Sequence, residues 1–466
     1  MIVFSPHSNE FFGIPLGAEF FLMSETPLII RSPKIHGPCF FAVHVFFLLT
    51  TTAAVAVRFY NNSVKIIEKD CAHAKCLTKA LVLEVIIIES RSKISNTVLR
   101  EIKYLRGMQD FMIDQRNSNR YRITVMESMG HTAYCFSTPI YHDDTKKIIH
   151  LDFRKAKSGY VFKGSSGTVS VCENRCVFEN RDGRIVVSLK DTPRIEGSTS
   201  TVHSPITLMP TLNGLRFTVK GSDLHLTLKA EIKHQNIRFN PSCFAIMQES
   251  FIPFFTVSAL YATNDNGVFS PLEMNYREES PQSYRLNLSH SVENATFAFE
   301  MNLYEPKLFQ DTTVESRHPD TNNVYGAIGF IGKTNQFGEQ WLYSRPDFSK
   351  IPDLTSHRID KALLHVPILN RCTDSLDVYI PQKRFCSFGS TWNKRIPSSE
   401  KIIGTNNNGR YMTIDVTSLF TSHIDSTLTY SEGMILKKPK GKNDFIAIST
   451  GDCYFAPQIL ELKFKT

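Results

Sequence analysis

The amino-acid sequence predicts an all-β protein with two antiparallel β-sandwich domains of jelly-roll-like form, preceded by a hydrophobic and partly helical N-terminal segment. Three observations predict this fold class. Short segments alternate apolar with polar residues, and this period of two is typical of strands with one buried face. Turn clusters rich in asparagine and glycine, such as residues 406–409, separate the segments. The 34 Phe and 16 Tyr suit β packing, and short strands between such turns favour antiparallel sandwiches over βαβ sheets.

The size and charge of the chain set the limits for its function. Its 466 residues are enough for two or three domains with sizeable cores. Hydrophobic residues make up 42% and charged residues 21%, as in folded globular proteins. A net charge of +8 can favour acidic partners such as uronic-acid polymers, teichoic acids or nucleic acid. Because no dense basic run is present, an ordinary solvated surface also explains this charge, and we do not predict nucleic-acid binding.

The first segment, residues 1–58, contains an apolar run at 40–57 that is free of Asp, Glu, Lys and Arg. The run has the minimum length of a membrane span, and small residues at 54–56 resemble a signal-peptidase site. We therefore expect a signal or anchor and a secreted or cell-surface protein, with membrane contact only through this segment. The alternative is a non-native extension, with translation starting at Met108, Met112 or Met126.

A helical or irregular linker is expected over residues 59–115. Val98, Ile102, Leu105 and Met108 recur at the spacing of one helix face. No turn pattern connects this region to the β pattern that follows, so we treat it as separate from the sandwiches.

The middle region, residues 116–305, is predicted to form the first β-sandwich domain. Alternation over 215–219 and 224–230, with a turn between them, predicts a hairpin. A second hairpin is expected over 176–189 and a strand over 297–303. Two sheets with apolar inner faces can enclose a core. The boundary to the next domain is expected near Pro306.

The last segment, residues 306–466, is predicted to form the second sandwich. Leu460, Leu462 and Phe464 alternate with charged residues, which predicts a closing edge strand with one buried face. Short landmarks follow one another in a recognisable order: FQDTTV at 309–314, PDTN at 319–322, GEQWLYSRPDFSKIP at 338–352, TWN at 391–393, DVTSL at 415–419, GMILK at 433–437 and APQILEL at 456–462.

These landmarks resemble the DNRLRE domain family in their order and spacing. The resemblance implies an exported β-sandwich module related to carbohydrate-binding modules, and some members of that family bind acidic polysaccharides. The chain departs from the family pattern at Ser344 and Pro346, which flank Arg345. Because proline removes a ladder donor, we expect this strand to be an edge strand or to carry a bulge.

Five residues are the candidate ligand-binding side chains. Trp392 offers an aromatic face that can stack on a sugar ring, with packing in the core as the alternative. Arg345, Lys394 and Arg395 can donate charge-assisted hydrogen bonds to an acidic polysaccharide or cell-wall glycan. Tyr343 shares the strand face of Arg345, and packing against the sheet is the alternative for Arg345.

No metal and no cofactor are predicted. Structural zinc needs four ligands, and neither Cys172 with Cys176 nor the group at 71–76 is followed by a second close pair of suitable spacing. Ordinary thiols are the simpler interpretation. Asp320 and Asn322 offer alternating oxygen ligands for calcium, but the glycine and glutamate of an EF-hand loop are missing, and a capping turn is the alternative.

The sequence predicts a non-catalytic protein. It contains no Gly-x-Ser-x-Gly elbow, His-Glu-x-x-His helix or Walker loop, and the glycines at 326–332 have the wrong spacing for a nucleotide fingerprint. We expect an extracellular or cell-surface binding protein with polysaccharide as the candidate ligand. A structural or assembly subunit without a sugar ligand is one alternative. A polysaccharide-degrading enzyme is the other, because two carboxylates brought together by the fold would suffice.

Overall fold

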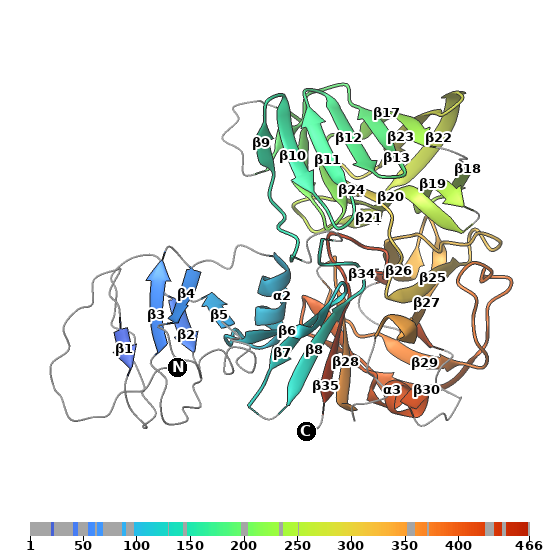
Figure 1. Cartoon of the computed structure of the whole chain (residues 1–466). Coiled ribbons are helices and arrows are strands. Elements are labelled where there is room, and N and C mark those ends of the chain that lie inside the picture. The colour runs from blue at the N-terminus through green and yellow to red at the C-terminus, as the bar shows by residue number, and fades with distance from the viewer. Residues whose placement is uncertain are drawn as a thin grey trace. The chain divides into compact units, whose positions relative to one another are not determined.

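Antiparallel β-sheets make up most of the chain in the computed structural model (Figure 1). The prediction of an all-β fold is therefore correct. The structure describes strands at 20–22, 41–44, 55–60, 63–68 and 86–89, and then residues 97–464 without 129, 143–146, 197–203, 233–235, 250, 352–358, 371, 425–432 and 440–443. The chain divides into two units, Met1–Ile113 and Asp114–Thr466.

The described residues of the first unit form two small sheets and the helix α2 (Thr97–Leu105). One sheet has the order β1 (Phe20–Leu22), β3 (Val55–Tyr60), β4 (Ser63–Glu68), and the other pairs β2 (Phe41–His44) with β5 (Ile86–Glu89). The predicted helix is present as α2 (Thr97–Leu105), with Val98 and Ile102 buried; Met108 lies beyond its end and is exposed. Among the described residues, no helix is long and apolar enough to cross a membrane.

Two eight-stranded sheets form the middle of the second unit. We call the first of them the β17 sheet. Its strands bury one face of the sheet, as β17 shows, where every second residue is buried. Its strands run in the order β22 (Glu273–Ser280), β23 (Ser283–Ser289), β17 (Asp223–Ile232), β13 (Gly183–Ser188), β12 (Arg175–Asn180), β11 (Thr168–Cys172), β10 (Gly159–Lys163), β9 (Arg154–Ala156).

The second middle sheet, the β20 sheet, packs on the β17 sheet. The rings of Phe178 in β12 and Phe255 in β20 lie 5.0 Å apart, and β11 and β12 lie against β16 and β24. This arrangement is sandwich-like. The strand order is β14 (Arg194–Ile195), β15 (Ile206–Pro210), β16 (Gly214–Lys220), β24 (Thr296–Leu303), β20 (Ile252–Thr263), β19 (Cys243–Glu249), β18 (Asn236–Asn240), with β21 (Phe269–Pro271) paired to β20.

One predicted hairpin is correct and the other is wrong. β12 and β13 pair with each other through the turn at 181–182, as expected. β16 and β17 are both strands, but β16 pairs with β15 and β24, whereas β17 pairs with β13 and β23. The turn between them therefore carries the chain from one sheet to the other. Both strands bury their apolar faces, which explains why each alternates like a hairpin strand although the two do not pair with each other.

The C-terminal part of the second unit also has two sheets around one core. The β27 sheet has the order β30 (Ser398–Gly404), β29 (Asp377–Pro381), β33 (Met434–Lys437), β27 (Gly338–Pro346), β26 (Ile328–Thr334), β34 (Phe445–Ser449), and β25 (Phe309–Glu315) also pairs with β27. The β35 sheet has the order β31 (Asn406–Asn407), β32 (Tyr411–Asp415), β28 (Ile359–Pro367), β35 (Ile459–Phe464), β8 (His131–Phe136), β7 (Arg122–Met126), β6 (Met112–Asn119).

The core between these sheets contains the residues on which the sequence argument depended. Leu460 and Leu462 are fully buried beside Leu342 of the facing sheet, and Phe464 packs at the margin. The helix α3 (Thr417–Ile424) covers one end, and the Asp415 carboxylate accepts a hydrogen bond from the Thr417 backbone at its start. The helix η1 (Phe348–Lys350) follows β27.

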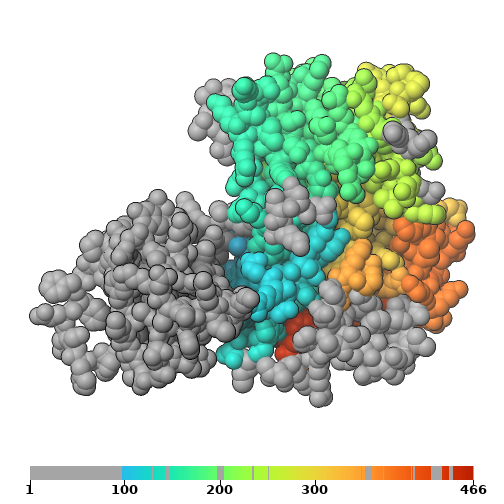
Figure 2. All heavy atoms as spheres, viewed as in Figure 1, coloured from blue at the N-terminus to red at the C-terminus, as the bar shows by residue number. Residues whose placement is uncertain are grey.

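One strand predicted to close a sheet, and one predicted to lie at an edge or to carry a bulge, are interior strands, and the pairs that β27 forms show no register shift. β35 pairs with β28 on one side and with β8 on the other, so it does not close the sheet. β27 has neighbours on both sides, and Pro346 is its last residue, where a missing donor interrupts no further ladder. The neighbour of β35 lies more than three hundred residues earlier, so local sequence patterns could not show it. Figure 2 shows the N-terminal strands of this unit in cyan beside the red C-terminal strand.

The segment β6–β8 therefore belongs to the β35 sheet, although the boundary at residue 116 assigned most of it to the middle region. The middle sheets contain only residues 154–303, which lie between β8 and β25 in the sequence. The C-terminal module is thus built from two separate stretches of the chain.

The middle and C-terminal sheets meet through apolar and polar contacts. Tyr261 and Ala298 of the middle sheets pack with Ile328 and Phe330 of the β27 sheet. Beside them lies a buried polar cluster, the junction cluster, whose members are Glu300, Lys307, Asp311, Asp452 and Tyr454. The two parts therefore share buried surface.

Candidate ligand-binding surface

The outward face of the β27 sheet carries the aromatic residues of the C-terminal module. Along β27, Leu342 faces the core, whereas the flanking residues Trp341 and Tyr343 face outward, as the period of two requires. The strand register places Tyr343 opposite Ile435 of β33, which in turn lies opposite Tyr379 of β29. Three neighbouring strands thus supply one apolar row.

The segment between β29 and β30, residues 382–397, covers part of this face. Its Phe385 and Ile396 are buried against Tyr343, and Trp392 packs at the margin of the same cluster. The Tyr343 hydroxyl donates a hydrogen bond of 2.8 Å to the Ile396 carbonyl. Burial raises the pKa of Tyr343 to about 12. Tyr343 is therefore a packing residue that holds the covering segment, and a ligand on the surface does not reach its hydroxyl.

Arg345 is also placed beneath the surface. Its side chain is buried, donates a hydrogen bond to Gln310, and lies with its guanidinium carbon 5.9 Å from the Phe385 ring centroid. The structure thus separates Arg345 from the other basic candidates, and its contacts support the covering segment from below.

Trp392 lies at the exposed end of the apolar row and contacts Trp341, a residue that the sequence analysis did not single out. The ring centroids of Trp341 and Trp392 are 5.1 Å apart with an interplanar angle of 53°. The Trp341 indole nitrogen donates a hydrogen bond to the Glu339 carboxylate at 2.8 Å. Both rings are half-buried, so each keeps part of its surface open to solvent.

Two cations lie directly over these rings. The Arg395 guanidinium carbon is 4.6 Å from the Trp392 centroid and 5.6 Å from the Trp341 centroid. The Lys437 ammonium is 3.7 Å from the Trp341 centroid and 4.8 Å from the Tyr379 centroid. We call the group Trp341, Tyr379, Trp392, Arg395 and Lys437 the Trp341–Trp392 surface.

The electrostatics of this surface favour an anion. Burial lowers the pKa of Lys437; the Glu339 carboxylate acts in the opposite direction, and the Arg395 charge, a smaller effect, lowers the pKa further. A negative ligand group would relieve the repulsion between the two cations. Lys394 is exposed beside them. The carboxylates near this surface have partners among the described residues: Asp377 forms an ion pair of 2.7 Å with Lys401, and Glu339 accepts the hydrogen bond from Trp341. Asp320 accepts a hydrogen bond from Asn393. The cations already cover part of the ring faces. A ligand would therefore mainly contact the positively charged hydrogen-bond donors and the edges of the aromatic rings.

The sequence contained part of the information needed to predict Trp341 and Lys437 as surface residues. Trp341 stands two residues before Tyr343, and Lys437 two residues after Ile435, so alternation places each on the outward face. Their proximity depends on the pairing of β27 with β33, which the sequence does not show.

The residues considered for metals have structural contacts instead. The Asn322 amide donates to the carbonyls of Ser387 and Ser390 at 2.6 and 2.8 Å, and the Asp320 carboxylate accepts from Asn393 at 3.0 Å. These bonds tie the covering segment to the module. Within the part of the chain that the structure describes, no three His, Cys, Asp or Glu residues are grouped to hold a metal ion. Residues 71–76 lie outside the described residues.

The other zinc candidate, the pair Cys172 and Cys176, does not bring its two thiols together on one face of the sheet. Cys172 is exposed and lies opposite Arg175, whereas Cys176 is buried and lies opposite Val171. In β11 and β12 alternate residues face opposite sides, so the two thiols point to different sides of the sheet.

Among the described residues, the carboxyl groups of Asp311 and Asp452 are close enough for shared proton chemistry. Asp311 and Asp452 share a hydrogen bond in the junction cluster, where burial raises the pKa of Asp452 to about 6 and raises the pKa of Asp311 as well. Both side chains are almost fully enclosed. A polysaccharide would have to separate the middle and C-terminal sheets to reach them, so the geometry favours a structural role.

Comparison with known proteins finds no matching family model and no matching curated protein. The resemblance of residues 309–462 to the DNRLRE family therefore stays a prediction.

Proposed function

We propose that this chain is a non-catalytic binding protein of the cell surface or extracellular space, and that the Trp341–Trp392 surface binds an acidic polysaccharide. The observation that carries the proposal is the placement of two cations, Arg395 and Lys437, over two solvent-accessible indole rings on the outward face of one sheet. Guanidinium and ammonium groups donate charge-assisted hydrogen bonds to carboxylates, and the indole edges offer apolar contact to sugar rings. The resemblance to the DNRLRE family supports the same ligand class.

The rigidity of the surface adds to this support. The hydroxyl of Tyr343, the guanidinium of Arg345 and the amide of Asn322 hold the covering segment from below. A preformed surface loses less conformational entropy when a ligand binds. The cations therefore need little rearrangement to meet a chain of uronic-acid residues.

The test uses the full chain with polygalacturonate as the acidic polymer and dextran as the neutral one. Trp341 and Trp392 are the two tryptophans of the sequence, so intrinsic fluorescence reports on this surface directly. We expect a saturable change with polygalacturonate that weakens as salt concentration rises, and none with dextran. Calorimetry measures the same affinities independently of the rings.

Matched arginine variants locate the binding. Loss of one hydrogen bond to a charged group costs about 1.5–3 kcal/mol, so Arg395→Ala is expected to weaken binding roughly tenfold or more. Arg181→Ala is the control, because Arg181 is 89% exposed in the turn between β12 and β13, away from the C-terminal sheets. Absence of polygalacturonate binding, or equal loss in both variants, would contradict the proposal.

An assembly role is the second candidate function, and one observation favours it. Phe251 is 59% exposed and Phe388 is 36% exposed, with their ring centroids 5.1 Å apart. Exposed apolar groups of this kind occur at protein interfaces. Sedimentation of the full chain without polysaccharide measures this alternative. Self-association that is lost in Phe251→Ser and retained in Arg395→Ala would favour assembly over polysaccharide binding.

A further inference from the structure

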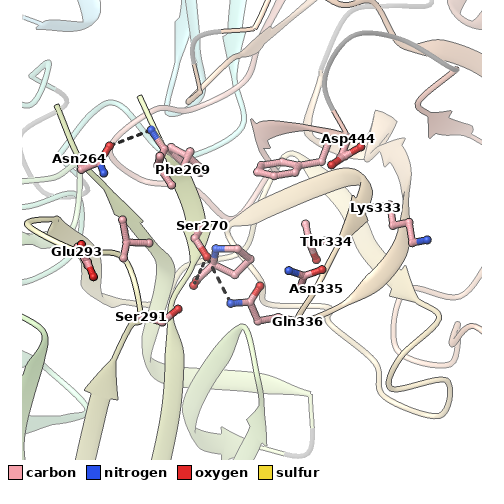
Figure 3. A pocket seen from close by; sticks show the side chains of 14 residues that line it. Asn264, Phe269, Ser270, Ser291, Glu293, Lys333, Thr334, Asn335, Gln336 and Asp444 are labelled. Atoms are coloured by element: carbon pink, nitrogen blue, oxygen red, sulfur yellow. Dashed lines mark hydrogen bonds between the residues drawn. The ribbon is translucent and has the colours of Figure 1, made fainter. Parts of the chain in front are cut away.

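A separate cavity of about 520 Å³ opens where the middle and C-terminal sheets meet (Figure 3). One wall comes from the loop between β20 and β21 and from the residues before β24. The other comes from the turn between β26 and β27 and from the start of β34. This volume lies within the range of small-molecule sites, roughly 300–1,000 Å³. None of the residues of the Trp341–Trp392 surface lines it.

The polar groups of the cavity are mostly uncharged. Asn264 and Ser270 project from one wall, and Thr334, Asn335 and Gln336 from the other (Figure 3). The Gln336 amide donates to the Ser270 hydroxyl at 3.4 Å across the cavity, which links the two walls. Within the described chain, the Asn335 side chain makes no hydrogen bond, so both its donor and its acceptor are available to a ligand.

Two half-buried phenylalanines supply the apolar part of the lining. Phe269 stacks on Tyr261 at 4.7 Å, and Phe445 contacts Phe330 at 5.9 Å. Because Phe330 also contacts Phe269 at 6.1 Å, one buried ring holds the two lining rings in place. The apolar surface of the cavity is therefore preformed on both walls.

The charges of the cavity oppose an acidic ligand. Glu293 and Asp444 line it with two carboxylates against the single ammonium of Lys333. A uronate would meet net negative charge here, in contrast to the Trp341–Trp392 surface. Amide groups, hydroxyls and carboxylates beside aromatic faces match a molecule that presents many hydroxyl groups and no charge.

We propose that this cavity is a second binding site that takes an uncharged sugar unit or short neutral oligosaccharide. The two proposed sites would then read different chemistry: the outward face of the β27 sheet takes anionic sugars, and the cavity at the junction takes neutral ones. The second site does not depend on the first, because their residues are distinct and their charges are opposite in sign.

The experiment titrates the full chain with maltotriose, cellotriose and xylotriose, and with trigalacturonate as the acidic counterpart, using saturation-transfer NMR and calorimetry. We expect saturable binding of at least one neutral trisaccharide. Asn335→Ala and Asp444→Asn are each expected to weaken that binding about tenfold, the effect of one lost hydrogen bond to a sugar hydroxyl in a partly enclosed site. Asn266→Ala is the matched control, because Asn266 is an exposed asparagine on the loop between β20 and β21, beside the opposite wall, and does not line the cavity.

The variants also separate the two sites. Asn335→Ala should leave polygalacturonate binding unchanged, and Arg395→Ala should leave neutral binding unchanged. Thermal unfolding of Asn335→Ala should match the parent chain, since its exposed side chain makes no hydrogen bond within the described chain. Failure of all three neutral trisaccharides to bind, or binding that survives Asn335→Ala and Asp444→Asn, would overturn the proposal while leaving the acidic-polysaccharide proposal intact.

Discussion

The buried carboxyl group of Glu300 makes the stability of the second unit depend on pH. Glu300 is fully enclosed in β24, and its two carboxyl oxygens accept hydrogen bonds of 3.2 Å from the backbone nitrogens of Tyr454 and Phe455. Burial raises its pKa from 4.5 to about 7, although those hydrogen bonds and the Lys307 charge act in the opposite direction. Ionisation of Glu300 is therefore less favourable in the folded chain than in the unfolded chain.

The sign and size of the effect follow from linkage. An acid with a raised folded-state pKa contributes stability that is fully present below its ordinary value and is lost as pH rises through the folded value. For Glu300 this window runs from pH 4.5 to about pH 7, and across it the free energy of unfolding decreases by about 3 kcal/mol. Roughly 2–3 kcal/mol of this decrease occurs between pH 5 and pH 8. Asp452, with a pKa raised to about 6, acts in the same direction.

The titration of Lys307 has the opposite effect on the free energy of unfolding, but most of that effect occurs above pH 8. Burial lowers its pKa from 10.5 to about 8, so its contribution is present above 10.5 and is lost as pH falls through 8. Little of that change remains below pH 8. We therefore expect the free energy of unfolding to fall as pH rises from 5 to 8.

Glu300→Gln tests the assignment. Glutamine keeps one acceptor oxygen, so one of the two backbone nitrogens loses its partner, at a cost of about 1–3 kcal/mol at all pH values. The decisive quantity is the slope: the fall in stability between pH 5 and pH 8 should shrink by about 2–3 kcal/mol relative to the parent chain. Urea unfolding at half-unit pH steps, followed by fluorescence and circular dichroism, measures both. An unchanged slope in Glu300→Gln would refute the reasoning.

Four substitutions test the packing. Leu460→Ala removes a fully buried side chain between the C-terminal sheets and should lower the free energy of unfolding by about 2–5 kcal/mol, measured by urea unfolding. Tyr343→Phe removes the hydrogen bond to Ile396 and should cost about 1–3 kcal/mol, and hydrogen exchange should increase in the covering segment while the β35 sheet stays protected. Gly214→Ala places a methyl group against the Met301 carbonyl and should reduce the yield of folded protein in expression trials, whereas Gly221→Ala, in open space but with a φ of +137°, should cost only about 1–3 kcal/mol.

The alternation of apolar and polar residues predicted strands well, because burial on one face leaves a period-two signal in each strand. Leu460 and Leu462 are fully buried as predicted, and β12 pairs with β13 as predicted. Pairing between distant strands leaves no local signal. β16 and β17 show the same turn and alternation as a hairpin, yet they join different sheets.

For the candidate site too, the sequence predicted some of the residues but not how the fold brings them together. Residue type identified Trp392 and Arg395, which do lie together on the outward face. Tyr343 and Arg345 share their strand face but are buried, because the covering segment, residues 382–397, packs on them. Lys437 reaches Trp341 only through the register of β27 and β33. The covering segment and the register are both tertiary features, so neither could be predicted from spacing.

The position of β8 between β7 and β35 determines how the protein can be divided and in what order it can fold. A fragment that begins at residue 306 would lack the neighbour on one side of β35 and would leave the backbone groups on that side of the strand unpaired, which is a template for aggregation. On the ribosome, β8 must wait for the whole middle region and nearly all of the rest to be synthesised before its partner emerges. Closure over such a sequence separation is slow, so nascent chains would depend on protection of β8 until synthesis is complete.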